Sequence, residues 1–204
     1  MRGARIVLVA IAIAFVASAD TVQLPAQVVD ALSSIDHATP VEDLDTLGSG
    51  SSAPAAAAAS QIAQVAANPN VDVGVALRSI YALSQYPQSV IGSSLAHDTL
   101  AQLVAAYISS SRPTDVLLLR ASIESLGPLR VSADADMLDC SPSSTLAGCP
   151  LDHPSRDVRT ATARALRDIG NPSAIPLLRA RLGAETVPQV KLAIAAALAA
   201  LGGG

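Results

Sequence analysis

Cys140 and Cys149 are the residues of this sequence best suited to covalent or metal chemistry, because they are its only cysteines and lie close together. They flank a segment rich in Ser, Pro and Gly. We therefore predict a disulfide between them, as is usual for a cysteine pair in an oxidising compartment. The alternative is a zinc site. Its ligands would be Cys140, Cys149 and His153, with Asp139 or Asp152 as the fourth, although this spacing fits no familiar zinc pattern.

Carboxylates in the same segment offer oxygen ligands of the kind that calcium prefers. The four candidates are Asp134, Asp136, Asp139 and Asp152. An EF-hand loop requires glycine at its sixth position and an acidic residue at its twelfth. Counted from Asp134, these positions hold Asp139 and Thr145, so the EF-hand motif is absent. Solvated loop carboxylates are the simpler interpretation.

Catalytic motifs are absent from the sequence. It contains no G-x-S-x-G elbow, P-loop, H-E-x-x-H helix or dinucleotide-binding fingerprint, and its three histidines share no metal-ligand spacing. His97 and Asp98 follow Ser93 and Ser94, which are residue types found in hydrolytic triads. The start of a helix attracts Ser and Asp for capping alone, so we interpret this group as structural. We predict that the protein is not an enzyme and has no cofactor.

Charge divides the chain into an acidic and a basic part. Residues 20–152 carry 4 basic and 14 acidic side chains, whereas residues 153–204 carry 7 and 3. The basic residues of the second part are Arg156, Arg159, Arg164, Arg167, Arg179, Arg181 and Lys191. We expect Arg159 and Arg164 to be exposed, or paired with Asp157 and Asp168. The cluster is interpreted either as ordinary solvated helix faces or as a patch that contacts an acidic partner.

Nucleic acid is an unfavourable partner for this composition. Apart from the three tyrosines, the only aromatic residue is one Phe near the N-terminus, and there is no Trp. Binding of single strands depends on aromatic faces, and the net charge of −4 repels phosphates. Another protein, acidic where it meets the basic cluster, is the predicted partner.

The N-terminal residues have the pattern of a secretory signal peptide at residues 1–19. Arg2 and Arg5 precede an apolar run from Ile6 to Ala17, followed by the small residues of a cleavage site. The run is shorter than the roughly 20 residues that a spanning helix needs, so we expect no stable membrane anchor. We predict export to the periplasm or the extracellular space. Residues 20–53 are interpreted as a short helix, an acidic stretch and a flexible linker, GSGSSAP.

The remainder, residues 54–204, has helical periodicity and an internal repeat. One apolar stripe ends at Gly170, and an equivalent stripe 32 positions later ends at Gly202. The first stripe is Val158, Ala161, Thr162, Ala165, Leu166 and Ile169, and the second is Val190, Ala193, Ile194, Ala197, Leu198 and Leu201. A weaker copy, from Val116 to Leu126, ends at Gly127. The helices predicted between the stripes span residues 55–67, 95–108 and 173–182, the last capped by Ser173.

The stretch DVRTATARALRDIGNPSAIPLLRARL, followed by VPQVKLAIAAALAALG, resembles HEAT repeats, in particular the short repeats named after the phycocyanobilin lyases. The shared pattern is Asp-Val-Arg, small residues, Ala-Leu, Ile-Gly-Asn-Pro and Ala-Ile-Pro-Leu-Leu. The resemblance implies an all-α fold: a short α-solenoid of antiparallel HEAT-like helix pairs, here with one disulfide-closed loop insertion at residues 128–155. Such solenoids are usually binding scaffolds, and the repeat itself does not imply lyase activity.

Three functions are therefore compared. The first is an exported, non-catalytic scaffold for protein–protein interaction, whose contact region is the basic cluster. The second is a cofactor-binding protein or enzyme related to the bilin lyases. The third is a structural envelope protein attached through its loop insertion. We favour the first.

Overall fold

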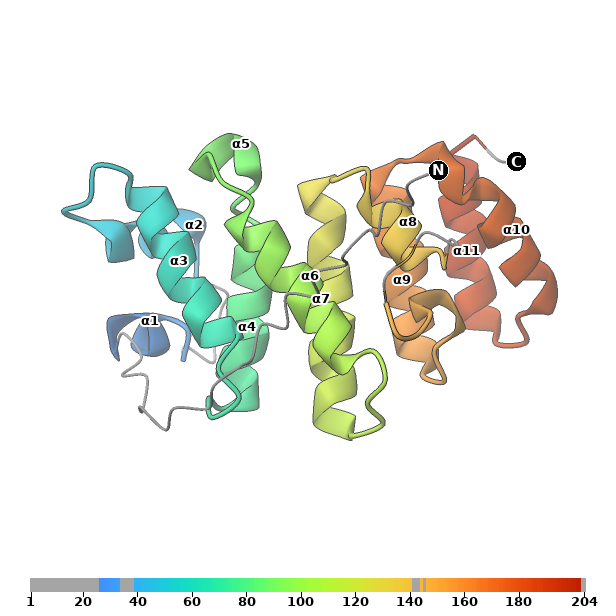
Figure 1. Ribbon diagram of the computed structural model, residues 1–204, viewed down its shortest axis with the longest axis horizontal. Coiled ribbons are helices and arrows are strands. Elements are labelled where there is room, and N and C mark those ends of the chain that lie inside the picture. Colours follow the sequence, from blue (N-terminus) through green and yellow to red (C-terminus); the bar gives the residue numbers. More distant parts are fainter. Residues whose placement is uncertain (1–25, 34–38, 141–143, 145, 203–204) are drawn as a thin grey trace, which may run out of the picture.

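The computed structural model describes residues 26–33, 39–140, 144 and 146–202, in which the chain forms eleven α-helices and no strand (Figure 1). This confirms the all-α prediction. The helices are α1 (Ala26–Ala31), α2 (Val41–Asp45), α3 (Pro54–Ala66), α4 (Val73–Leu83), α5 (Gln88–Ile91), α6 (Leu95–Tyr107), α7 (Pro113–Leu129), α8 (Asp134–Leu138), α9 (Arg156–Ile169), α10 (Ile175–Ala184) and α11 (Pro188–Ala200). The predicted signal peptide lies outside the described residues. None of the described helices is both long and apolar enough to cross a bilayer.

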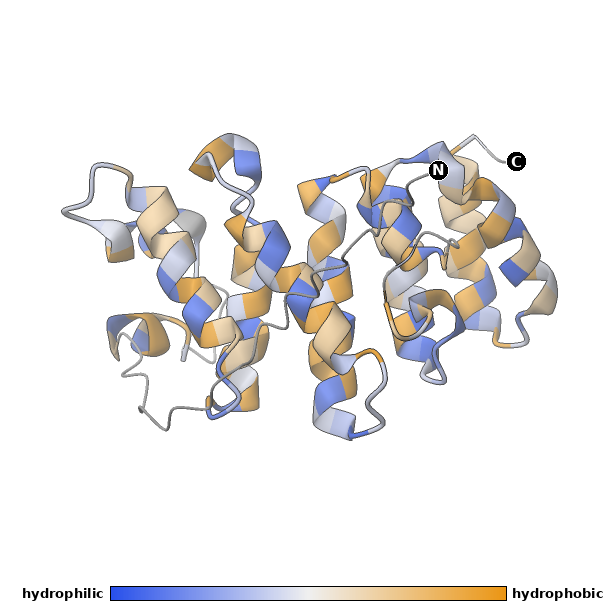
Figure 2. Ribbon diagram, viewed as in Figure 1, coloured by the Kyte–Doolittle hydropathy of each residue, from blue (hydrophilic) through white to orange (hydrophobic). Residues whose placement is uncertain are grey.

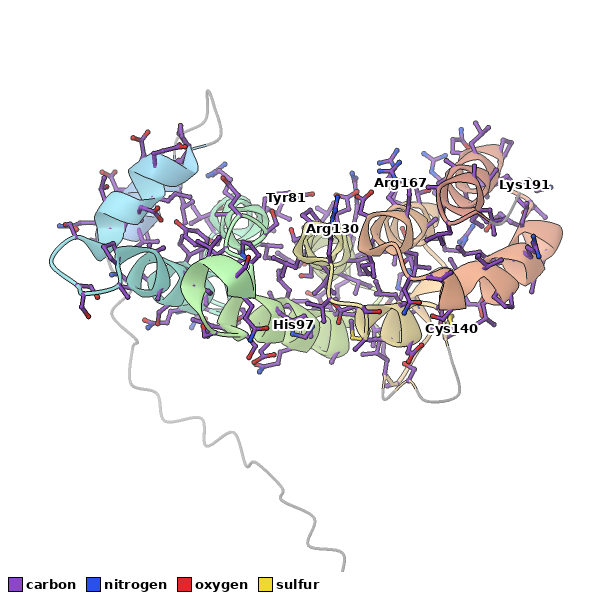
Figure 3. The ribbon with its side chains drawn as sticks, turned by 90° about the horizontal axis from the view of Figure 1, so that it is seen from above. Tyr81, His97, Arg130, Cys140, Arg167 and Lys191 are labelled. Carbon is purple, nitrogen blue, oxygen red and sulfur yellow. A yellow bond between two sulfur atoms is a disulfide. The ribbon has the colours of Figure 1, made fainter. Side chains whose placement is uncertain are left out.

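The main helices lie in two rows (Figure 3). The inner row consists of α4, α7, α9 and α11, each packed on the next, and the outer row consists of α3, α6, α8 and α10. Helix α3 packs on α4, α6 on α7, α8 on α9 and α10 on α11. The rows bend so that the inner row lies on the concave side. Apolar and hydrophilic residues alternate along each helix, as expected for helices with one buried face (Figure 2).

One hydrophobic core runs through the molecule from α1 to α11. It is built mainly from Ala, Leu, Val and Ile, and Tyr86 is its one buried aromatic residue among those described. Small side chains allow close approach of helices but bury little area each, so each helix depends on its neighbours for burial. Thr162 of α9 is fully buried, and its hydroxyl donates to the carbonyl of Val158 at 2.8 Å. In the same way, the hydroxyls of Ser79 in α4 and Ser122 in α7 each donate to the carbonyl four residues earlier in the helix.

The repeat predicted in the C-terminal part is present as two equivalent inner helices. Most of each predicted stripe is buried in α9 and α11. Gly170 and Gly202 follow these helices with φ of 77° and 76°, the left-handed conformation that glycine adopts without strain. The cap predicted for the intervening helix is wrong, because the side chain of Asn171, not Ser173, accepts a hydrogen bond at the start of that segment, from the Ser173 N–H.

The helix end predicted at Gly127 is also wrong. Helix α7 continues to Leu129 and ends at Arg130, which has φ of 53°. Gly127 serves a different purpose, since a Cβ there would lie 3.1 Å from Cβ of Asp168 and 3.2 Å from Cα of Ala165. The absence of a side chain therefore permits the close packing of α7 on α9.

The segment GSGSSAP, predicted to be a flexible linker, forms a turn between α2 and α3. Gly48 is buried, and a Cβ there would lie 2.0 Å from the carbonyl oxygen of Pro54. The side chain of Gln61 donates to the carbonyl of Leu47 at 3.1 Å. Tyr86 donates to Asp45 at 2.9 Å, which joins the turn after α4 to α2. The N-terminal helices are thus packed on the rest of the molecule.

Candidate protein-interaction surface

Cys140 and Cys149 form a disulfide with a Cα–Cα distance of 5.2 Å, as predicted. With Asp152 they make the one group of three potential metal ligands that comes together among the described residues. Their sulfurs are bonded to each other and are not thiolates, which zinc would require. His153 is buried, and its Nδ1 accepts the N–H of Ser155 at 3.1 Å. The arrangement is therefore that of a structural staple.

We expect the Cys140→Ser/Cys149→Ser variant to lose roughly 2.5 to 3 kcal/mol of unfolding free energy, because the bridge restricts a short loop in the unfolded chain. Urea denaturation under non-reducing conditions measures the loss. Addition of a reducing agent should lower the stability of the wild type and leave the variant unchanged. An equal response of both proteins would contradict a stabilising bridge.

The carboxylates considered for calcium are not gathered into one site. Asp134 lies 2.8 Å from Nε2 of His97, and Asp152 lies 2.6 Å from Nη1 of Arg181. Asp139 is buried, whereas Asp136 is exposed. No three of these oxygens converge on a common point in the part of the chain that the structure describes.

His97 of α6 joins α8 through Asp134 and also contacts Asp98, its neighbour on α6. Its Nε2 lies 2.8 Å from Asp134 and its Nδ1 lies 3.0 Å from Asp98. The hydroxyl of Ser94 donates to Asp98 at 2.6 Å and not to the imidazole. The hydrogen bond to Asp134, together with that to Asp98, raises the pKa of His97 to about 9 despite its partial burial. Because both ring nitrogens are engaged, the imidazole has no site to accept a proton from serine, and the group is an ionic lock rather than a triad.

The ion pairs of His97 predict that the folded protein loses stability at alkaline pH. The pKa of His97 is about 9 in the folded protein against 6.5 ordinarily, so the stabilisation is complete below pH 6.5 and disappears as the pH rises through 9. Because the side chain is partly exposed, we expect a loss on the order of 1 to 2 kcal/mol. Urea midpoints between pH 6 and 9.5 measure it. His97→Gln should be less stable at pH 6 and should flatten this dependence, and an unchanged slope would refute the assignment.

Arg159 does not belong to an exposed basic patch, which corrects the interpretation of the sequence. Its side chain is 9% exposed, and its Nε and Nη2 donate to both oxygens of Glu185 at 2.8 and 3.1 Å. Nη1 donates to the carbonyls of His153 and Pro154. The guanidinium thus joins the start of α9 to the turn between α10 and α11, and a partner protein cannot reach it.

Glu185 is the centre of this buried network. Arg181 donates to Glu185 at 3.0 Å, and the N–H groups of Thr186 and Val187 donate to its other oxygen. The hydrogen bonds from Arg159, with those from the backbone and Arg181, lower the pKa of Glu185 to about 2 although burial opposes the change. Arg181 also donates to Asp152, so most of its guanidinium is engaged in contacts within the protein.

The other basic residues of the predicted cluster are exposed, but they do not share one surface. Arg179 lies on α10 in the outer row. Arg167 and Lys191 are labelled on the inner-row helices in Figure 3, and Arg156 and Arg164 belong to α9. Arg167 lies 2.8 Å from Asp168, in place of the Arg164–Asp168 pair predicted from sequence, and Arg156 lies 3.6 Å from Asp157.

A hollow of about 250 Å³ crosses the inner row between α7 and α11. Its lining residues are Arg120, Glu124, Arg156, Asp157, Thr160, Arg164 and Gln189. Arg120 and Tyr81 both donate to Glu124, at 3.1 and 2.9 Å, and burial with the Glu124 contact raises the pKa of Tyr81 to about 12. Arg120 and Glu124 were not singled out from the sequence, although their spacing of four positions on one helix is a signal for an ion pair. Tyr81 joins them only through the packing of α4 on α7.

Residues 145–202, which include α9, α10 and α11, match a family model described as HEAT repeats. The match supports a HEAT-repeat family for the chain, and it covers both units in which the repeat is clearest. No curated protein matches the chain.

Proposed function

We propose that this protein is an exported, non-catalytic α-solenoid of antiparallel HEAT-like helix pairs that binds another protein on its inner row. The observation that carries the proposal is the charged hollow across α7, α9 and α11, three helices of the inner row, of which α9 and α11 lie in the residues that match HEAT repeats. HEAT repeats commonly serve as scaffolds for protein partners. A stack of helices held together by continuous burial gives such a surface a fixed shape.

A non-catalytic role is supported by the chemistry of the described side chains. His97, the histidine considered above as a catalytic base, is held between two carboxylates. The most strongly perturbed carboxylate, Glu185, is buried and fully bonded to arginines and backbone N–H groups. Both arrangements stabilise helix packing and leave no free base near a nucleophile.

Export is supported by the signal-like N-terminus and by the disulfide. We expect chain recovered from the envelope or the medium of the native cell to begin at Asp20. N-terminal sequencing or intact-mass measurement tests this, and recovery of the chain only in the cytoplasm with residues 1–19 intact would exclude export.

The binding proposal is tested by site-specific photo-crosslinking in the native cell fraction. A photoreactive residue at Thr160 or Gln189, both of which line the hollow, should capture the same partner. The control position is Gln102, which is exposed on α6 in the outer row. Equal capture from Gln102, or no protein captured from either inner position, would contradict a partner surface on the inner row.

A further inference from the structure

A second hollow, of about 370 Å³, continues the first one along the inner row. Both hollows are lined by Arg164 and Gln189, so together they form one groove from α7 across α9 to α11. The additional lining residues are Arg167, Leu192, Ala193 and Ala196. We call this combined surface the α9–α11 groove.

The floor of the groove on α11 is apolar and open. Leu192 is 71% exposed, the most exposed large hydrophobic residue among those described. Ala196 follows it by one helical turn, and both lie beside Ala193 in the same hollow. Helix α11 carries a single charged residue, Lys191, and Gln189 is the one polar residue that it contributes to the groove. An exposed apolar surface rimmed by polar side chains is typical of a face that another molecule covers.

The walls of the groove are positively charged. Four guanidinium groups face it, from Arg120, Arg156, Arg164 and Arg167, against the two carboxylates of Glu124 and Asp157. Arg164, which lines both hollows, is exposed and forms no ion pair with any residue that the structure describes. Arg120, Arg156 and Arg167 each lie beside a carboxylate, of Glu124, Asp157 and Asp168, so Arg164 is the one unpaired guanidinium of the four. An apolar floor beside this unpaired arginine and an excess of arginines is complementary to a segment that has apolar and acidic side chains side by side.

We propose that the α9–α11 groove binds an acidic amphipathic helix of a partner protein. The apolar face of the bound helix lies on Leu192, Ala193 and Ala196, and its carboxylates pair with Arg164 and Arg167. A helix is the fitting element because Leu192, Ala193 and Ala196 lie on one face of α11 at helical spacing, and such a face packs against the apolar face of a second helix. The inference rests on the proposed function, since it names the part of the partner that the inner row holds.

The test uses a synthetic helical peptide of about 16 residues, with Leu at every third or fourth position and Glu along both edges of the Leu stripe. Its binding to the full chain is measured by fluorescence anisotropy. Arg164→Glu/Arg167→Glu and Leu192→Asp should each weaken binding by roughly tenfold or more. Arg179→Glu, a charge reversal on α10 outside the groove, should leave the affinity unchanged.

A charge exchange makes the test specific. The same peptide with Lys in place of Glu should bind Arg164→Glu/Arg167→Glu and not the wild type. Equal affinity of the Glu peptide for the wild type and the double variant would overturn the proposal, as would tighter binding of anionic vesicles or single-stranded DNA than of the peptide. Capture of a partner at Thr160 together with no binding of the acidic peptide would reject the helix inference and retain the scaffold function.

Discussion

Glu185→Leu is expected to cost about 3 to 5 kcal/mol of unfolding free energy, because the substitution leaves the buried guanidinium of Arg159 without its counter-ion. The variant also removes the acceptor for the N–H groups of Thr186 and Val187. Arg159→Met should lower the unfolding free energy by less, since Glu185 then retains Arg181 and both backbone donors. Equilibrium urea denaturation gives the order of the two losses.

Two controls separate this network from ordinary surface charge. Arg156→Met removes an exposed arginine of the same helix, whose contact with Asp157 is 3.6 Å, and should change stability by less than about 0.5 kcal/mol. The pKa of Glu185 is lowered to about 2, so its stabilisation is present above pH 4.5 and disappears as the pH falls toward 2. Glu185→Leu should lose this part of the acid sensitivity, and equal losses from Glu185→Leu and Arg156→Met would contradict a buried network.

Leu166→Ala is expected to destabilise the protein by about 2 to 5 kcal/mol, because Leu166 is fully buried in α9 and leaves a cavity when truncated. Helix α9 packs on both α7 and α11, so neighbouring helices cannot close the cavity without moving apart elsewhere. Leu192→Ala makes the same chemical change at a side chain that is 71% exposed, and should alter stability by less than about 0.5 kcal/mol.

The comparison of these two leucines tests the packing directly. Thermal or urea unfolding of both variants should show one large and one negligible shift. Similar losses would mean that Leu192 is packed in solution, which would remove the open floor of the α9–α11 groove. A negligible loss for Leu166→Ala would mean that α9 is not packed between α7 and α11.

Local patterns were sufficient to predict much of the fold. The stripes of α9 and α11, their glycine ends and the disulfide all depend on residues close together in sequence, and each is present in the structure. Gly127 was misinterpreted because glycine also permits close helix packing, and only the position of Ala165 distinguishes that use from a helix end. Composition also does not reveal that Gly48, at the start of the GSGSSAP segment, packs on Pro54.

The surface was predicted less well than the fold. The sequence correctly directed attention to a basic C-terminal part, but periodicity could not show that Arg159 faces inward. Its partner, Glu185, lies 26 positions away, across the turn that follows α10. Nor could the sequence group Arg120 and Glu124 with Arg164, since these residues come from different helices that only the packing of α7 on α9 brings together.

The central claim, that the inner row is the partner-binding face, is tested most directly by methyl NMR of the chain with and without the captured partner. We predict shifts or broadening for the methyl groups of Thr160, Leu192 and Ala193, which line the α9–α11 groove. The methyl groups of Ala105 and Ala180, exposed on the outer-row helices α6 and α10, should not change. Perturbation confined to Ala105 and Ala180, with the groove methyls unaffected, would contradict the claim.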